Sequence, residues 1–464
     1  MSRAPIHISV LASAALLISG CGGSSGSSGN TGNGGGNGGG GGPTTVTFMF
    51  VFNSAPTVAA KIGSGSFAPM ALSSNTLTLT IPHGTTDFAV AYLCPAYPYY
   101  VDGIQYSYND QYVILASTED QTSFTESCPS PNLSSFSYSV DASAIPGAQN
   151  VLVEVGNNTR TLYCNYGELQ TGPQSCATAT GGDTAFVDAY AGSISANDYH
   201  ALAIRRYDRQ TVPGSVNGGA IVTLDAADET TSAPVVYQNL PAEFQPYVHV
   251  YFDTATEGNL MLAASSQTYL TNYPILPAAA VESGDYYSVE AQAWNGASAC
   301  GEAIGTSGGA VTIQYPSQWS YVGPTAAALP TFDFSSYVAF NNASGLDRHA
   351  DVTWSPSGLV VNHYRVSATA NASNGSASVA YPDLSGVAGF LANPGSGSIV
   401  DWLAEIENYS AGSMAPESAG TTRSWVENEG SFVVPLKNGA DCLTPPTFLV
   451  IVRRLCKAMR VSVS

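Results

Sequence analysis

The sequence predicts an all-β protein built from tandem β-sandwiches. Only 10% of its 464 residues are charged, while Gly, Ser, Thr, Val and Tyr are abundant, which is typical of β-rich proteins. Short apolar or alternating runs recur between Gly, Pro, Asn and Asp, as expected for strands joined by turns. Helical periodicity is almost absent, and residues 399–407 are the one candidate short helix.

The amino terminus has the pattern of a secretory signal. Arg3 precedes an apolar stretch at 6–18 that leads into Ile18-Ser19-Gly20-Cys21. This stretch is shorter than the roughly 20 residues that a membrane-spanning helix needs. Ile18-Ser19-Gly20-Cys21 resembles the lipobox of bacterial lipoproteins. The resemblance implies cleavage before Cys21, lipidation of Cys21 and, because Gly22 follows rather than Asp, sorting to the outer membrane or cell surface.

Residues 22–42 contain only Gly, Ser, Asn and a single Thr, so they cannot form an apolar core. A flexible chain of this length spans roughly 25 Å on average. We expect a tether that holds the following domains away from the membrane.

Strand patterns dominate the rest of the chain. The clearest runs are residues 46–52, 77–81, 88–93, 112–116, 151–155 and 248–252. Residues 137–142, which precede the run at 151, resemble residues 221–226, which precede the run at 248. This faint repeat suggests modules of roughly 85–100 residues. Short strands in units of that size predict β-sandwiches, with a β-propeller as the alternative architecture.

These patterns divide the chain into consecutive parts. They are a signal peptide at 1–20, the lipidated cysteine and linker at 21–43, β modules at 44–132, 133–230, 231–330 and 331–436, and a tail at 437–464. Near 350–435 the last module resembles a fibronectin type III or similar Ig-like domain, through Trp354, Tyr364, Tyr381 and Trp402. That resemblance implies a two-sheet sandwich.

The tail concentrates positive charge beside Cys456. Its basic residues are Arg453, Arg454, Lys457 and Arg460. They indicate either a basic docking segment or a terminal strand with solvated charges, unless the chain end is altered.

The formal charge of −20 disfavours nucleic acid as a partner, because phosphate groups are also negative. We predict no cofactor. The partners that we expect are the membrane, through the lipid anchor, and a glycan or an envelope protein.

Export to an oxidising compartment makes disulfides the expected state of the cysteines. We predict the pairs Cys94–Cys128 and Cys164–Cys176, the second of which flanks a short polar loop. The sequence leaves open the pairing of Cys300, Cys442 and Cys456.

Few motifs point to chemistry. Residues 305–309 match Gly-x-Ser-x-Gly, but a strand pattern follows where a hydrolase needs a helix, so we predict a turn and no catalytic residue. Asp347, His349 and Asp351 alternate and would share one strand face, and His363 on the next strand would complete a candidate metal site. The alternative is an ordinary exposed polar face.

The densest aromatic stretch is 97–112. Sugar rings stack on aromatic faces while carboxylates accept hydrogen bonds from hydroxyls, so a glycan-binding surface is one interpretation. Its candidate residues are Tyr99, Tyr100, Tyr106, Tyr108 and Asp102. Turn residues throughout the stretch predict an exposed loop or hairpin rim with several rings facing solvent. Strand and rim packing is the alternative interpretation.

We therefore expect a cell-envelope lipoprotein that is a binding or structural module rather than an enzyme. One alternative is a glycan-active hydrolase, which needs two carboxylates roughly 5–9.5 Å apart. The other is an adhesin or scaffold without a small-molecule site.

Overall fold

The computed structural model describes residues 42–52, 54–101, 104–128, 134–157, 160–164, 174–178, 184–193, 196, 198–207, 221–242, 244–254, 258–337, 346–410 and 418–435. Within these ranges almost every regular element is a β-strand, and the only α-helix is the single turn α1 (Ala372–Gly375). No helix in them is long and apolar enough to cross a membrane. The all-β prediction is confirmed. The candidate helix at 399–407 is wrong, because these residues lie in strand β27 (Ile399–Tyr409).

The first group of strands sets a pairing pattern. β1 (Thr44–Val51) pairs antiparallel with β4 (Thr76–Ile81) and parallel with β8 (Ser123–Ser127) in a small sheet. The remaining strands form a second sheet in the order β3, β2, β5, β7, and β6 pairs with the first half of β7. Their bounds are β2 (Thr57–Ile62), β3 (Ala68–Met70), β5 (Asp87–Leu93), β6 (Tyr97–Val101) and β7 (Ile104–Ser117).

Two further groups repeat this pattern, without a described counterpart of β6. In the second, β9 (Ser134–Asp141) lies between β12 (Gln174–Thr178) and β15 (Ile221–Thr223). In the third, β16 (Thr231–Gln238) lies between β19 (Asn272–Ile275) and β22 (Val311–Gln314). Their second sheets contain β10 (Asn150–Asn157), β11 (Arg160–Cys164), β13 (Thr184–Ser193), β14 (Asp198–Tyr207), β17 (Gln245–Thr254), β18 (Gly258–Ser265), β20 (Tyr286–Trp294) and β21 (Ser298–Thr306).

The fourth group pairs β23 (Thr331–Asp333) with β26 (Ser378–Ala380) in its small sheet. Its second sheet contains β24 (Leu346–Ser357), β25 (Val360–Ala368), β27 and β28 (Thr422–Val433).

The first, third and fourth groups are each a pair of sheets with apolar residues between them, and the second group has the same strand pairing. In the first group, Phe48, Leu79 and Phe124 of the small sheet join Phe88 and Val90 of the second sheet in one buried cluster. This arrangement confirms the sandwich class. The β-propeller alternative is wrong, because the described strands form stacked sheets instead of radial blades.

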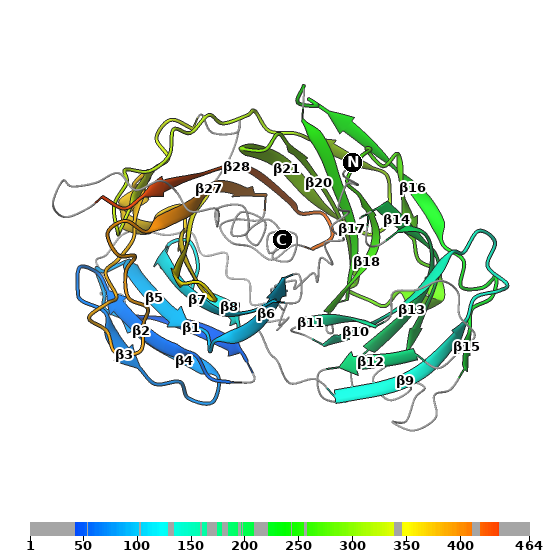
Figure 1. Ribbon diagram of the computed structural model, residues 1–464, viewed down its shortest axis with the longest axis horizontal. Coiled ribbons are helices and arrows are strands. Elements are labelled where there is room, and N and C mark those ends of the chain that lie inside the picture. The colour runs from blue at the N-terminus through cyan, green and yellow to red at the C-terminus, as the bar shows by residue number, and fades with distance from the viewer. Residues whose placement is uncertain are drawn as a thin grey trace, which may run out of the picture.

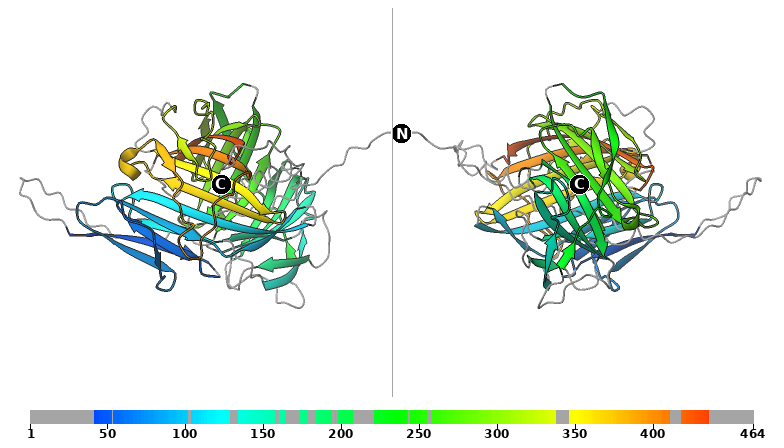
Figure 2. Two further views of the ribbon diagram at one scale, coloured as in Figure 1. Left: turned by 60° about the vertical axis from the view of Figure 1, so that its left-hand side comes forward. Right: turned by 90° about the vertical axis from the view of Figure 1, so that its right-hand side faces the viewer.

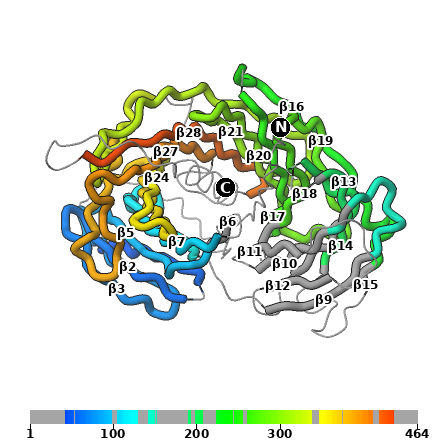
Figure 3. The backbone as a smooth tube through the Cα atoms, in the orientation of Figure 1, coloured from blue at the N-terminus to red at the C-terminus, as the bar shows by residue number. Residues whose placement is uncertain are grey.

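The second sheets of the four groups join edge to edge into one 17-stranded sheet. β14 pairs with β18, β21 with β28, and β7 with β25. Figure 1 shows the groups following one another around an arc, with the blue first group beside the orange fourth group. The same order can be followed from other sides in Figure 2 and along the backbone in Figure 3. Because one sheet runs through all groups, the module boundaries given above stay a prediction.

The repeat proposed from the sequence is wrong in its alignment. Residues 137–142 and 221–226 do not occupy equivalent places in successive modules, because β9 and β15 are parallel neighbours in one sheet, with Val222 opposite Val140. The pairing pattern makes β9 equivalent to β16, and β15 equivalent to β22.

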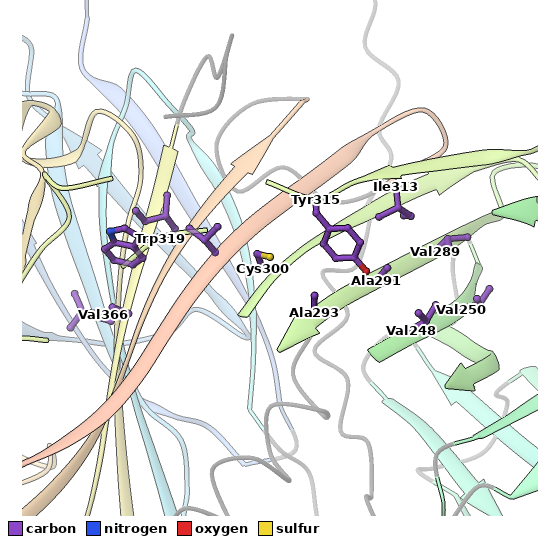
Figure 4. Packing of buried hydrophobic residues seen from close by; sticks show 14 of the residues in the cluster. Val248, Val250, Val289, Ala291, Ala293, Cys300, Ile313, Tyr315, Trp319 and Val366 are labelled. Carbon is purple, nitrogen blue, oxygen red and sulfur yellow. The ribbon is translucent and has the colours of Figure 1, made fainter. Parts of the chain in front are cut away.

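One apolar core runs through the third and fourth groups. Figure 4 shows Val250 and Ile313 in the third group, Val366 in the fourth, and Trp319 on the segment between them. Trp319 stacks on Phe334 with ring centroids 5.6 Å apart. The two sandwiches therefore share their packing as well as their hydrogen-bonded sheet.

The disulfide Cys94–Cys128 is confirmed, with Cα atoms 5.4 Å apart. It links the end of β5 to the end of β8 and so joins the two sheets of the first sandwich. The side chains of Cys164 and Cys176, and all of Cys442 and Cys456, lie outside the described residues, so the second pair stays a prediction. Cys300 is a buried free thiol whose pKa is raised to about 12, chiefly by burial.

Gly301 marks a close approach between the third and fourth sandwiches. It lies in β21 opposite Trp425 of β28, and a Cβ atom at Gly301 would stand 2.3 Å from Cζ2 of the Trp425 ring. Only a hydrogen atom fits there. We predict that Gly301→Ala lowers the free energy of unfolding by about 1–3 kcal/mol, the usual cost of overpacking.

The measurement is chemical denaturation of both variants and the wild type. Gly309→Ala is the matched control, because nothing lies within 4 Å of a Cβ atom built there. Equal stability of the two variants would contradict close packing at this seam.

Candidate functional site

The densest set of ionisable side chains lies on one face of the large sheet, opposite the shared apolar core. In β24, Ala350 and Val352 point into that core, so the alternating residues Asp347, His349 and Asp351 point to the other side. The strand registers place charged residues of β20, β25, β27 and β28 on the same side. We call this the polar face. Its members are Glu290, Asp347, His349, Asp351, His363, Arg365, Glu405, Glu407, Arg423, Glu427 and Glu429.

His363 lies at the seam where β25 meets β7. Its Nδ1 is 3.0 Å from Oδ1 of Asp110, and its Nε2 is 2.8 Å from Oδ1 of Asp351. Asp110 also accepts a hydrogen bond from the Tyr97 hydroxyl at 2.9 Å. Arg365 extends the cluster, 3.7 Å from Asp351 and 3.4 Å from Glu405.

Burial is the largest influence on the His363 pKa, and it acts to lower it. The hydrogen bonds and negative charges of Asp110 and Asp351 together outweigh burial and raise the pKa to about 9. His363 is therefore a cation at neutral pH. The single positive charge of His363 attracts both carboxylates across the seam and balances one of their two negative charges.

A second cluster surrounds Glu407. His349 lies 3.0 Å from Glu407 through Nε2 and 2.8 Å from the Ser367 hydroxyl through Nδ1. Arg423 lies 3.4 Å from the same carboxylate, and the Tyr409 hydroxyl donates to it. Burial alone would raise the pKa of Glu407, but the charge and hydrogen bond of His349, together with Arg423, hold it below its usual range. Glu407 is therefore ionised.

Glu405 behaves in the opposite way. Burial and the negative charge of Glu407 raise its pKa well above the usual range, and Arg365 only partly opposes them. Two carboxyl groups two positions apart on one strand thus favour different protonation states. Such a difference is typical of paired catalytic carboxyl groups and is also found in structural ion networks.

The polar face continues into the core of the first sandwich. His363 packs edge-on against Tyr112 of β7, with ring centroids 5.9 Å apart. Tyr112 stacks on Tyr92, whose hydroxyl donates to Glu126 at 2.6 Å. Burial raises the pKa of Glu126 to about 7. Titratable groups therefore reach from the fourth sandwich into the first.

The candidate metal ligands are only partly brought together. His363 and Asp351 are hydrogen-bonded to each other, whereas His349 bonds to Ser367 and Glu407. Among the described side chains, no three His, Cys, Asp or Glu residues form a group that could hold a metal ion. The metal interpretation has no geometric support in this part of the chain.

Asp110, Arg365, Glu405 and Glu407 of this network do not belong to the candidate sites predicted from the sequence. The usable signal was in β27, where the acids Asp401, Glu405 and Glu407 stand at odd positions while Val400, Ala404 and Ile406 fill the core. That period of two identifies a strand with one polar face.

The tyrosine-rich stretch forms the β6–β7 hairpin. Tyr97 pairs with Tyr108, and Tyr99 with Tyr106. The prediction of rings facing solvent is wrong for Tyr106 and Tyr108, each 3% exposed. Asp110 is equally buried because Tyr97 and His363 satisfy its carboxylate. The side chains of Tyr99, Tyr100 and Asp102 lie outside the described residues, so glycan binding stays a prediction.

The Gly-x-Ser-x-Gly match is a turn, as predicted. It joins β21 to β22, and the Thr306 hydroxyl accepts hydrogen bonds from the backbone of Gly308 and Gly309 at 3.3 Å. A surface hollow elsewhere is lined by Gln245, Pro246, Ser266 and Gln267. None of these four described residues is a carboxylate or a histidine.

No protein-family model and no curated protein matches this sequence. Among solved structures, the chain is weakly similar to the Bacillus anthracis TIE protein, with 8% identity and a TM-score of 0.13 over 84% of this chain and 66% of that one. It is also weakly similar to the chicken CNTN1 FN1–FN3 domains, with 10% identity and a TM-score of 0.13 over 62% of this chain and 91% of that one. Similarity at this level carries no argument about function.

The raised pKa of His363 predicts a stability that depends on pH. Its pKa of about 9 in the folded chain exceeds the ordinary 6.5, so protonated His363 favours folding. That contribution is complete below pH 6.5 and is lost as the pH rises through about 9. The difference between these pKa values corresponds to at most roughly 3 kcal/mol.

We expect the melting temperature of the wild type to fall as the pH rises from 6.5 to about 9. In His363→Gln the melting temperature should change less over the same pH range. His83→Gln is the control, because His83 is exposed on the surface. If all three proteins showed the same pH profile, the charge of His363 would not stabilise the seam.

Proposed function

We propose that this protein is a lipid-anchored module of the cell envelope that binds a partner or bears structure, without catalysing a reaction. The observation that carries this proposal is the bonding within the polar face. His363 bridges Asp110 and Asp351, while His349 bridges Ser367 and Glu407. A histidine held between a hydroxyl and a carboxylate can act on a substrate that reaches it, but Ser367, His349 and Glu407 are each at most 9% exposed.

The location rests on the amino terminus. The lipobox-like sequence before Cys21 and the Gly-rich tether after it support anchoring at the outer membrane or cell surface. The disulfide Cys94–Cys128 supports an oxidising compartment. Cys21 itself lies outside the described residues.

The ligand is the less defined part of the proposal. The tip of the β6–β7 hairpin, with Tyr99, Tyr100 and Asp102, is the candidate glycan-binding surface. The fibronectin type III resemblance near 350–435 supports a binding or scaffolding role for the fourth sandwich. If this hairpin binds no glycan, the proposal becomes an adhesin or scaffold without a small-molecule site.

A glycan-active hydrolase is the second candidate, favoured by one observation. Glu405 and Glu407 share a strand face, and their pKa values are displaced in opposite directions. A protonated and an ionised carboxyl group are the two groups that glycoside hydrolysis requires. Their burial among Arg365, His349 and Arg423 argues against access by a sugar.

The anchor is tested with Cys21→Ser. Because acylation needs the thiol, we expect wild type in the membrane fraction and the variant in the soluble fraction, with lipid found on the wild type by mass analysis. A variant that still sedimented with membranes, beside a wild type without lipid, would refute the anchor.

The role of the body is tested on a panel of envelope polysaccharides, with retention and reducing-sugar release measured together. Retention that is lost in the double variant Tyr99→Ala, Tyr100→Ala, with an unchanged melting temperature, supports glycan binding. Sugar release that disappears in both Glu405→Gln and Glu407→Gln supports hydrolysis and overturns the proposal. If the protein shows neither retention nor sugar release, the result supports the scaffold.

A further inference from the structure

β4 is the longest edge strand among the described strands of this chain. Its one described neighbour is β1, so its other side is an open edge of the small sheet β4-β1-β8. Figure 1 shows β4 on the outside of the arc that the sandwiches form. Such an edge presents backbone N–H and C=O groups to any extended chain that reaches it.

The register shows which backbone groups of β4 lie at this edge. The amide of Phe50 in β1 donates to the carbonyl of Asn75 at 2.7 Å, and hydrogen-bonded pairs recur at every second residue of an antiparallel ladder. The odd-numbered residues of β4 therefore bond to β1, whereas Thr76, Thr78 and Thr80 direct their N–H and C=O groups to the open edge. The preceding turn bonds to both groups of Thr76. Within the described strand, Thr78 and Thr80 thus supply the groups that a further strand would use.

The sequence of β4 lacks the usual protection of an open edge. Proteins commonly block such edges with proline, with charge or by keeping the strand short. Among the other described edge strands, β3 contains Pro69, β19 contains Pro274 and β8 contains Glu126. β4 reads Thr-Leu-Thr-Leu-Thr-Ile, with its Leu and Ile side chains buried and its Thr side chains on the outer face. A strand without charge or proline and with this alternation favours pairing with another strand.

The open edge is complementary to itself. When two copies of β4 pair antiparallel about a two-fold axis at Leu79, Thr78 of each copy lies opposite Thr80 of the other. Each of these pairs can exchange both of its backbone hydrogen bonds, so no N–H or C=O group of either residue is left over. The side chains that meet on the outer face are uncharged threonines. The contact therefore brings no like charges together, although each copy has a formal charge of −20.

We propose that β4 joins two copies of this chain into one continuous sheet. The contact is small, and interfaces that bury less than about 1,000 Å² are weak, so we expect a dissociation constant of about 0.1–1 mM in solution. Copies anchored in one membrane meet more often, because tethering raises their effective concentration. The contact goes beyond the proposed function and does not depend on the anchor.

Sedimentation of the Cys21→Ser protein tests the pairing without lipid, and if the anchor proposal fails, the unlipidated wild type takes its place. Between about 10 µM and 1 mM, we expect monomer to convert to dimer. In the variant Thr78→Lys, Thr80→Lys, each pair would bring two lysines together, so dimerisation should weaken at least about tenfold.

The matched control is Thr45→Lys, Thr47→Lys. It adds the same charge to the outer face of β1, whose two edges are already paired with β4 and β8, so this variant should dimerise like its parent. Equal melting temperatures show that the variants are folded. A parent that stays monomeric, or a control that weakens as much as the edge variant, would overturn the proposal.

Mixing experiments test the register. The lysine edge variant mixed with Thr78→Glu, Thr80→Glu should regain the dimer, because each lysine then faces a glutamate of the other copy. Under oxidation, Thr78→Cys mixed with Thr80→Cys should form linked dimers several-fold faster than either variant alone, since position 78 faces position 80. Equal linking rates would overturn the two-fold pairing. A chain whose β4 pairs only with a strand of a different protein would leave the mixture unlinked and would also overturn it.

Discussion

The architecture depends on the parallel pairing of β7 with β25, in which the paired residues are about 250 positions apart in the sequence. Nine residue pairs form this seam, from Ser107 opposite Val360 to Leu115 opposite Ala368. Val113 and its partner Val366 lie in the large core, whereas the next residue, Ile114, lies in the separate core of the first sandwich. The first and fourth sandwiches therefore pack on opposite faces of one sheet. At the seam with β25, one face of β7 changes along the strand from polar to apolar. The ionisable groups at this seam are shielded from water.

That loss of water explains why the charges of the polar face bond to one another. His363 is held between Asp110 of the first sandwich and Asp351 of the fourth, so breaking the seam would leave buried charges without their partners. Removing one partner of such a group typically costs about 3–5 kcal/mol. The network therefore acts as a register lock for β7 on β25, because a slip by one residue would move every charge to the apolar side. Asn109 of β7 and Asn362 of β25 add a direct hydrogen bond of 2.9 Å to the same register.

Local sequence was sufficient to predict the fold class and the positions of many strands, because the alternation of apolar and polar residues and the turn residues act within a few positions. The runs at 77–81 and 88–93 became β4 and β5 with little change at their ends. Residues 399–407 failed because their apolar residues also fit a helical spacing, and only the partners of β27 on both sides select a strand. The repeat failed for a similar reason. β9 and β15 resemble each other as neighbours in one sheet, and a comparison of sequence segments cannot separate neighbours from equivalents.

The candidate site was harder to predict for the same reason, since local sequence does not reveal which strands become neighbours. Alternation in β24 placed Asp347, His349 and Asp351 on one face, but the meaning of that face depends on β7, β25 and β27, which only the sheet order brings alongside. Asp110 illustrates the consequence, since Asn109 and Asp110 itself indicate an exposed turn while a histidine from the fourth sandwich makes burial favourable. A carboxylate next to turn residues is therefore weak evidence for exposure in a chain whose sandwiches share a sheet. In such a chain a buried polar residue at a seam, such as Asp110, is explained by a partner from another sandwich and not by its own surroundings in sequence.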